Sequence, residues 1–254
     1  MRQFLLPREY AGEARISLAG DDLHYLTRVL RLREGDAVPA IDAGGTRYSL
    51  RLLHIGAAVC EAAVEPAPAT EPSPLHEPDL RITLLQCLPK GPKMDSIVRQ
   101  ATEAGVARIV PLHSEHSLLG SGDLSGRQRR WERIAREALQ QSGNQRLPVL
   151  EQPRPLMSIR AAEEWGTALF FHEKPLGNEP LHELLAHAPS RVSVLIGPEG
   201  GLSPAEVDFL EQAGFRPVYL GEGVLRVDTA AIAAVAVVKQ IVRETHAWRP
   251  ISEK

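Results

Sequence analysis

The sequence predicts an α/β protein in two parts: a small β-rich N-terminal domain, then a larger α/β domain with a mainly parallel sheet. Up to residue 64, short apolar stretches of strand length are separated by turn residues. Beyond residue 78, such stretches alternate with amphipathic helical segments, which is typical of an open parallel sheet. Residues 65–78 contain five of the chain's 20 prolines and predict a stiff linker. In this chain of 254 residues we therefore expect domains at 1–70 and 71–254.

The N-terminal part predicts strands interrupted by one helix. The strands are expected at the apolar stretches 14–18, 48–55 and 59–64. The sequence Asp-Ala-Gly-Gly at 42–45 suits a hairpin turn, and Asp21 or Asp22 can cap the helix. The apolar residues of this helix fall at helical spacing, at Leu23, Leu26, Val29 and Leu30.

The larger part predicts alternating strands and helices. Its strands are expected at the apolar runs 80–88, 106–112, 167–171, 192–196 and 217–220. Helical spacing predicts helices around 94–101 and 131–139, ended by glycines at 105 and 143. The next helix is expected to start at Ser203, because Ser-Pro-Ala-Glu offers a capping serine, a first-turn proline and a glutamate that closes a capping box. A last helix is expected from near Ala230.

Composition and cysteine usage exclude several classes of protein. The hydrophobic share of 43% and the charged share of 24% exclude disordered and fibrous chains. Cys60 and Cys87 are far apart and have no Cys or His at metal-ligand spacing, so we expect neither a disulfide nor a metal site. The N-terminus lacks the apolar core of a signal peptide, and the late apolar run 230–238 is far shorter than the ~20 residues of a membrane helix. We therefore expect a soluble, cytoplasmic protein.

The charge balance bears on nucleic-acid binding. A net charge of −3 argues against binding by charge alone, so RNA binding would require local patches. Two arginine clusters could supply them: Arg28, Arg31 and Arg33, and further along Arg127, Arg129, Arg130, Arg133 and Arg136. From charge alone, a solvated helix face is the alternative interpretation of each cluster.

Two glycine-containing loops at the ends of successive predicted strands indicate a ligand site. The first, Ile-Gly-Pro-Glu-Gly-Gly-Leu-Ser at 196–203, is neither a P-loop nor a Rossmann fingerprint, and taken alone it could be a tight turn. The second, at 220–229, leads into the last helix. Glycines let backbone amides approach a ligand, and ligands of open α/β sheets lie beyond the carboxyl ends of the strands. The two loops could therefore converge on one crevice.

These loops and other stretches resemble the RsmE family of ribosomal RNA methyltransferases, in the SPOUT superfamily. The matching stretches lie at 24–32, 90–105, 110–117, 141–148, 196–203 and 220–230, so they cover nearly the whole chain. The sequence IGPEGG followed by LGxxxLRxxTA is highly specific in that order and spacing. The resemblance implies a PUA-like RNA-binding domain at 1–70 and, at 71–254, a methyltransferase domain with the α/β trefoil knot of the SPOUT fold. It also implies a homodimer.

The resemblance further implies a cofactor, S-adenosyl-L-methionine, gripped mainly by backbone groups. The implied cofactor-binding residues are Phe171, His172, Ile196, Gly197, Pro198, Gly200, Gly201, Leu220, Gly221, Leu225, Val227 and Thr229. The expected RNA contacts are Arg28, Arg31, Lys90, Lys93 and Arg146. The implied partner is 16S ribosomal RNA of the small ribosomal subunit.

The reaction that the resemblance implies is methylation of N3 of one uridine, expected at position 1498 of that RNA. Because this nitrogen carries a proton, the site needs a base or a cation that stabilises the anion. We expect Arg226 to hold the uracil carbonyls, because a guanidinium offers paired donors that keep their charge. Glu199 and Asp228 are both candidates to take the proton or to orient Arg226. Helix capping by Glu199 and a surface ion pair between Arg226 and Asp228 are the alternative interpretations.

Three positions depart from the family pattern. Asp228 stands where the family usually has Glu, and His116 and Asn144 stand where arginine is common, which leaves Arg146 as the nearest match for a phosphate contact. Two alternative functions are a SPOUT methyltransferase with another RNA target and a ribosome-assembly protein that binds RNA without catalysis. The intact pair of glycine loops with Arg226 favours an enzyme.

Overall fold

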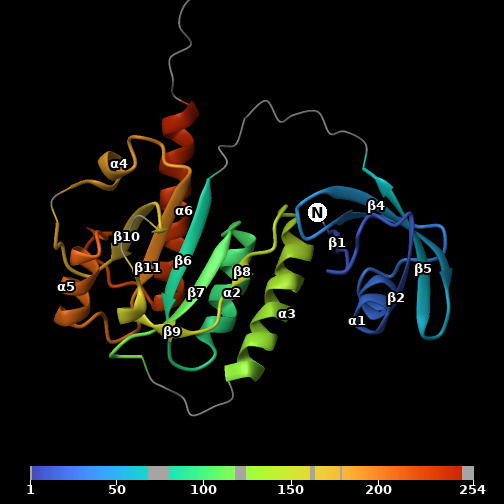
Figure 1. Cartoon of the computed structure of the whole chain (residues 1–254), viewed down its shortest axis with the longest axis horizontal. Coiled ribbons are helices and arrows are strands. Elements are labelled where there is room, and N and C mark those ends of the chain that lie inside the picture. The colour runs from blue at the N-terminus through green and yellow to red at the C-terminus, as the bar shows by residue number, and fades with distance from the viewer. Residues whose placement is uncertain (1, 68–79, 118–123, 161–163, 178, 248–254) are drawn as a thin grey trace, which may run out of the picture. The chain divides into compact units, whose positions relative to one another are not determined.

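The computed structural model describes residues 2–67, 80–117, 124–160, 164–177 and 179–247. The chain forms two compact units, coloured by residue number in Figure 1. One consists of Met1–Pro72 with Arg136–Leu147, and the other of Ser73–Ala135 with Pro148–Lys254. Most of the predicted linker lies outside the described residues, and Pro66 is the last residue of a strand in the first unit.

The first unit contains a five-stranded sheet in the order β1-β3-β4-β5-β2. Its strands are β1 (Phe4–Leu5), β2 (Arg15–Ala19), β3 (Ala37–Ile41), β4 (Arg47–Ile55) and β5 (Val59–Pro66). β1 pairs parallel to β3, and the other neighbours are antiparallel. The predicted turn joins β3 to β4, and the Asp42 carboxylate stabilises it by accepting the N–H groups of Gly44 and Thr46 at 2.8 and 2.9 Å.

The predicted helix of the first unit is present but irregular. It begins as α1 (Gly20–His24) and continues as a π-helical turn, η1 (Tyr25–Val29), closed by a hydrogen bond from the Leu30 N–H to the Tyr25 carbonyl at 2.9 Å. The next residue, Arg31, has a φ of 59°, which is uncommon for a residue other than glycine. Isolated π turns are rare and often occur at functional sites, so this segment is structurally distinct from an ordinary surface helix.

The segment Arg136–Leu147 belongs to the first unit because of its contacts with β1 and β3. Leu139 packs against Leu5 and Ile41. The side-chain amide of Gln3 donates hydrogen bonds to the carbonyls of Leu139 and Asn144 at 3.1 and 2.7 Å. Gln3 lies more than 130 positions from Leu139 and from Asn144 in the chain, so no local sequence pattern could have shown the association.

The second unit contains a seven-stranded sheet in the order β12-β10-β11-β6-β7-β8, with β9 also paired to β7. Its strands are β6 (Arg81–Cys87), β7 (Arg108–His113), β8 (Val149–Leu150), β9 (Arg154–Pro155), β10 (Thr167–Phe171), β11 (Arg191–Ile196) and β12 (Arg216–Val218). The pairings between these strands are all parallel. The carboxyl ends of β10, β11 and β12 therefore lie at one edge of the sheet, where ligands of open α/β folds bind.

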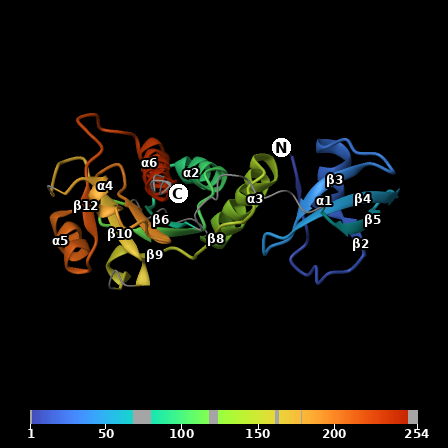
Figure 2. The same ribbon diagram turned by 90° about the horizontal axis from the view of Figure 1, so that it is seen from above.

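Helices cover both faces of this sheet (Figure 2). The helices that follow β6 in the chain are α2 (Lys93–Glu103), α3 (Leu124–Ser142), α4 (Leu181–Leu184), α5 (Pro204–Gln212) and α6 (Val227–Ala247), with a 3₁₀ turn, η2 (Leu156–Ser158). From Arg136 onward, α3 belongs to the first unit. α2 and α6 pack against each other, and α6 also contacts β6 and β11. On the other face, α5 packs against η2 and β12. Small buried residues of α6, such as Ala231 and Ala234, allow this close packing.

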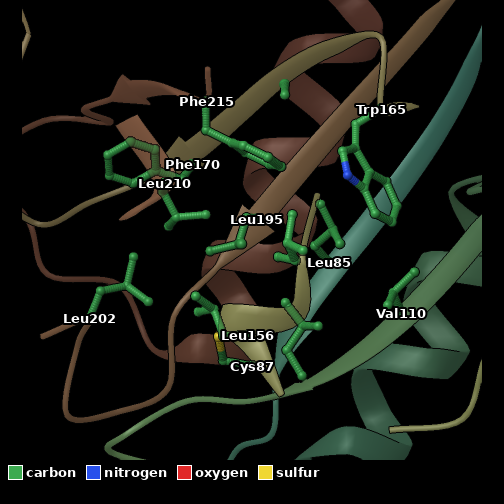
Figure 3. Packing of buried hydrophobic residues seen from close by; sticks show 13 residues of the cluster. Leu85, Cys87, Val110, Leu156, Trp165, Phe170, Leu195, Leu202, Leu210 and Phe215 are labelled. Carbon is green, nitrogen blue, oxygen red and sulfur yellow. The ribbon is translucent and has the colours of Figure 1, made fainter. Parts of the chain in front are cut away.

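The face covered by α5 contains a cluster of buried aromatic and aliphatic side chains (Figure 3). Trp165, Phe170 and Phe215 are buried there against Leu195 of β11. Leu202, which follows the first glycine loop, belongs to the same cluster. Burying a leucine side chain contributes about 1.5–3 kcal/mol, so this residue anchors the loop to the core.

The strands and helices predicted for the second unit are present among its described residues, with small shifts at their ends. β12 ends at Val218 rather than at residue 220, and α6 begins at Val227 rather than near Ala230.

The sequence did not predict β1, β8, β9 or α4, because elements this short carry no periodicity. It also missed β3, in which Pro39 interrupts the strand pattern.

Candidate active site

A cavity that is open to solvent lies at the sheet edge where the two glycine loops meet. Its walls come from the carboxyl ends of β10 and β11 and the residues after them, from the loop after β12, and from the start of α6. Most of the cofactor-binding residues predicted from the sequence line it: Phe171, His172, Ile196, Gly197, Pro198, Gly201, Leu220, Gly221, Leu225 and Val227. Parallel β10 and β11 bring Phe171 beside Ile196, which explains why segments far apart in the chain share one wall.

The first glycine loop is a tight turn with little free space on its outer side. The Gly201 N–H donates to the Pro198 carbonyl at 2.9 Å, and Gly201 has a φ of 73°. A Cβ added at Gly200 would lie 2.9 Å from the Cβ of His116, closer than real carbon atoms approach. Gly200 is thus placed against His116 rather than in the cavity wall, although it was predicted among the cofactor contacts.

The second glycine loop leaves space in the cavity. Gly221 has a φ of 115°, and a Cβ built there or at Gly223 would meet no atom within 4 Å. Both glycines line the cavity. Because these residues have no side chains, this part of the wall presents backbone groups to a ligand. Thr229, also predicted as a cofactor contact, lies beyond this loop in α6 and outside the cavity wall.

A buried glutamate, Glu206, fixes the end of the first loop. Its carboxylate accepts the N–H groups of Ser203 and Glu115 at 2.9 and 2.8 Å, and the Ser203 hydroxyl accepts the Glu206 N–H at 3.4 Å. This is the predicted capping box of α5. The bond to Glu115 also ties the segment after β7 to the glycine loop. His116 adds a second tie by donating from Nδ1 to the Gly201 carbonyl at 3.1 Å.

Glu199 lies in the cavity wall but its carboxylate is already engaged. It accepts a hydrogen bond from the Lys93 ammonium at 2.6 Å and others from the Lys90 backbone N–H at 3.1 and 3.2 Å. Partial burial opposes ionisation, but the hydrogen bonds from Lys93 and from backbone N–H groups outweigh it and lower the pKa of Glu199. Glu206 caps α5, so the alternative capping role for Glu199 was wrong.

Arg226 and Asp228 lie beside the cavity without lining it. They flank Val227, which lines the cavity at the start of α6. Arg226 is exposed, and its guanidinium has no hydrogen bond or ion pair within the described part of the chain. Asp228 is partly buried, and its Oδ1 has no hydrogen-bond partner among the described residues. The alternative of an ion pair between these two side chains is therefore wrong.

The predicted RNA contacts are distributed over both units. Arg28, Arg31 and Arg146 are exposed on the first unit, where Arg28 lines a shallow depression together with His24 and Thr27. Lys90 and Lys93 belong to the second unit and contact Glu199 as described above.

The arginines of α3 divide into two groups. Arg130 pairs with Asp95 at 2.6 Å, and Arg136 pairs with Asp22 at 2.8 Å, so these two serve the structure. The remaining arginines of the cluster, Arg127, Arg129 and Arg133, are exposed. The solvated-face interpretation thus holds for only part of the cluster.

The cavity wall also contains residues that the sequence analysis did not single out: Glu173, Leu202, Gly223, Val224 and Ala230. All of them lie within or next to the stretches that the sequence did identify. Glu173 is the one ionisable residue of these five, and it places a carboxylate directly after β10. The periodicity of β10 ends before it, so only its position after a buried strand could have indicated a role.

Two absences apply to the described residues. No group of three or more His, Cys, Asp or Glu side chains among them could hold a metal ion. No described helix is long and apolar enough to cross a membrane.

Family profiles match both parts of the chain. The profile of the RNA methyltransferase domain matches residues 76–239, and that of the RNA methyltransferase PUA domain matches residues 18–59. The first match includes the cavity and both glycine loops, and the second includes the depression beside Arg28. The fold, the site and these matches place the chain in the class of RNA methyltransferases.

Individual relatives specify the family. The chain is 33% identical to the ribosomal RNA small subunit methyltransferase E of Synechocystis sp. over 88% of this chain and 72% of the relative. It is 25% identical to the enzyme of the same name from Bacillus subtilis, over 87% and 88%. The chain belongs to the RsmE family, as its sequence motifs indicated.

Solved structures agree with this assignment. RsmE from Neisseria gonorrhoeae, bound to S-adenosyl methionine, is 27% identical and superposes with a TM-score of 0.79, covering 95% of this chain and 98% of that one. A putative methyltransferase of Legionella pneumophila, in complex with the same cofactor, has 25% identity and a TM-score of 0.79, covering 94% and 96%. These similarities confirm the predicted fold class of a β-rich N-terminal part and a SPOUT domain with a parallel sheet.

Proposed function

We propose that this protein transfers a methyl group from S-adenosyl-L-methionine to N3 of a uridine in 16S ribosomal RNA, the uridine expected at position 1498. The observation that carries the proposal is the convergence of both RsmE glycine loops on one cavity. Membership in a family of ribosomal RNA small subunit methyltransferases supports the RNA substrate.

The cavity suits the proposed cofactor. Gly221 and Gly223 leave space for a nucleoside and expose backbone groups, and Phe171, Ile196 and Leu225 offer apolar contact surface. Such a wall, mostly apolar with a few polar groups, is typical of cofactor sites. When bound, S-adenosyl-L-methionine supplies a methyl group made electrophilic by its sulfonium sulfur. Gly200 and Thr229 lie outside the wall, and we propose that they act by shaping the loop and the helix start rather than by direct contact.

Arg226 is suited to the RNA side of the reaction. Its guanidinium has no partner within the described residues, so it is free to hold the uracil carbonyls while negative charge develops on the base. Its backbone is fixed, because its carbonyl accepts the Ala230 N–H at 2.7 Å in the first turn of α6. With a fixed backbone and no side-chain partner, Arg226 can bind the substrate without first breaking another interaction.

The structure favours Asp228 over Glu199 as the group that takes the N3 proton or orients Arg226. Glu199 is held by Lys93 and by the Lys90 N–H, and its lowered pKa makes it a weak base. Oδ1 of Asp228 is buried and has no hydrogen-bond partner among the described residues. A buried oxygen without a hydrogen bond destabilises the fold unless substrate or water donates one to it. Glu199 would then position the first glycine loop against α2.

RNA binding is proposed for the exposed basic residues of both units. On the first unit these are Arg28, Arg31 and Arg146, with the depression beside Arg28 offering a concave surface. On the second unit Lys90 extends into solvent, whereas Lys93 is paired with Glu199 and contributes mainly through that pair. Cationic side chains of this kind position RNA through its phosphates.

Three further properties belong to the same proposal: the trefoil knot of the methyltransferase domain, a cytoplasmic location and a homodimer. The dimer has structural support in the exposed apolar side chains of the second glycine loop. Val224 is 81% exposed, and Leu220 and Leu225 are 38% and 40% exposed. Apolar side chains gathered on a loop at the cavity would be shielded from water by a second subunit.

The decisive experiment is nucleoside mass spectrometry of 16S RNA. Purified protein and S-adenosyl-L-methionine are incubated with small ribosomal subunits from cells that lack the modification. We expect 3-methyluridine to appear in the reaction with the intact protein and not in the reaction without the methyl donor. A methylated ribose, another methylated base or no product at all would refute the proposed target atom.

A further inference from the structure

Glu173 occupies a defined position in the cavity. It follows β10 directly, where the His172 N–H donates to the Val218 carbonyl at 3.0 Å and the Lys174 N–H donates to His172 Nδ1 at 3.1 Å. These bonds hold the backbone on both sides of Glu173. Its carboxylate extends over Gly201, because a Cβ built at Gly201 would lie 3.3 Å from Oε2. The side chain therefore spans from the end of β10 to the first glycine loop.

The two carboxylates in the cavity wall, Glu173 and Glu199, differ in whether a neighbouring cation compensates their negative charge. Glu199 is neutralised by Lys93 at 2.6 Å. Within the described residues, Glu173 makes no hydrogen bond or ion pair with any cation. Lys93 and Glu199 thus form a satisfied pair, whereas Glu173 leaves the wall with an uncompensated negative charge.

We infer that Glu173 binds a positively charged group of the methyl donor, and this inference rests on the proposed function. S-adenosyl-L-methionine carries a sulfonium and an ammonium against one carboxylate, so it is a net cation, whereas S-adenosylhomocysteine has lost the sulfonium charge. A carboxylate within a few ångströms attracts such a cation, most strongly where water is partly excluded. The same carboxylate gives no advantage to a neutral nucleoside.

The test compares Glu173→Gln with the intact protein by isothermal titration calorimetry, without RNA and therefore without turnover. Glutamine keeps the size of the side chain and removes the charge. We expect the Kd for S-adenosyl-L-methionine to rise about tenfold, which corresponds to about 1.4 kcal/mol. The Kd for 5′-methylthioadenosine, which has neither cation, should change less than about twofold. The loss should shrink as salt is added, because salt screens exposed charges.

S-adenosylhomocysteine identifies the group that Glu173 binds. A weakening equal to that of S-adenosyl-L-methionine assigns the ammonium, and an unchanged Kd assigns the sulfonium, in which case Glu173 also favours release of the product. Both outcomes support the inference. An equal weakening of 5′-methylthioadenosine, or an unchanged Kd for S-adenosyl-L-methionine, would overturn it.

Glu222→Gln is the matched control. Glu222 is exposed and lies between Gly221 and Gly223 but does not line the cavity, so this variant removes the same charge close by. We expect Glu222→Gln to bind all three ligands with the Kd values of the intact protein. If Glu222→Gln weakened S-adenosyl-L-methionine binding as much as Glu173→Gln, the effect would come from the overall charge around the cavity, and the inference would be overturned. If the intact protein itself bound no S-adenosyl-L-methionine, the proposed function would fail first, which is distinguishable from failure of Glu173 alone.

Discussion

At the scale of single residues, the site combines side chains that are engaged in the fold with side chains that await a ligand. Glu199 and Glu206 belong to the first group, since each accepts several hydrogen bonds. Arg226 and Glu173 belong to the second, since neither has a partner in the described part of the chain. Substitutions in the first group should therefore affect stability, and those in the second should affect ligand binding or turnover.

Arg226→Ala is expected to lower kcat by about 10²-fold, which is typical for loss of one group that stabilises developing negative charge. The Kd for S-adenosyl-L-methionine should stay within about twofold, because Arg226 does not line the cavity. Steady-state methylation and calorimetry measure the two quantities. Arg99→Ala serves as the control, because Arg99 is also an exposed arginine but lies on α2. Near-normal turnover of Arg226→Ala would remove this residue from the mechanism.

Gly221→Ala is expected to weaken cofactor binding about tenfold. Gly221 lines the cavity, so a methyl group there changes the cavity wall, and a φ of 115° strains any residue with a side chain by about 1–3 kcal/mol. Gly12→Ala imposes similar strain at a φ of 107° on a residue of the first unit that does not line the cavity. Calorimetry should show a higher Kd for Gly221→Ala alone. Equal effects of both variants would show that strain, rather than occupation of the cavity, is responsible.

At the scale of elements, the start of α5 determines how the first glycine loop is held. Ser203→Ala removes one cap and should destabilise the protein by about 1 kcal/mol. Glu206→Ala leaves the N–H groups of Ser203 and Glu115 without their acceptor, and the buried Ser203 N–H alone costs about 1–3 kcal/mol. Urea unfolding should therefore give a larger loss for Glu206→Ala. A smaller loss than that of Ser203→Ala would contradict the double role of Glu206.

The contact between the start of α2 and the first glycine loop should depend on pH. The folded pKa of Glu199 lies below its ordinary value of 4.5, so its stabilising contribution is fully present above about pH 4.5. The contribution is lost as the pH falls through the lower folded pKa. In urea titrations, the intact protein should therefore lose more stability between pH 6 and pH 3 than Glu199→Gln, in which the other carboxylates titrate unchanged. Parallel losses would show that the Lys93 pair contributes nothing.

At the scale of the whole molecule, the exposed apolar residues of the second glycine loop predict association. Light scattering should give twice the chain mass of 27.8 kDa. Val224→Asp should shift the protein toward the monomer, because it places a charge where an 81% exposed valine would be buried. Val59→Asp, at an exposed valine of the first unit that is 42% exposed, is the control. A monomeric intact protein would contradict the proposed dimer.

The sequence by itself determined the elements that have periodicity or a specific cap. The parallel strands of the second unit follow from apolar runs, and the α5 start follows from Ser203 and Glu206. Motif spacing indicated the residues that line the cavity, because both glycine loops follow strands whose carboxyl ends share one edge. These signals lie within short windows of sequence, which is why they can be read without the fold.

The tertiary structure alone decided which groups meet across the chain. Arg136–Leu147 belongs to the first unit because Leu139 packs with Leu5 and Ile41. Glu199 is held by Lys93, and Glu173 reaches over Gly201, because parallel strands bring the ends of β6, β10 and β11 together. Such pairings depend on sheet order and register, which arise from packing of the whole core rather than from any local pattern.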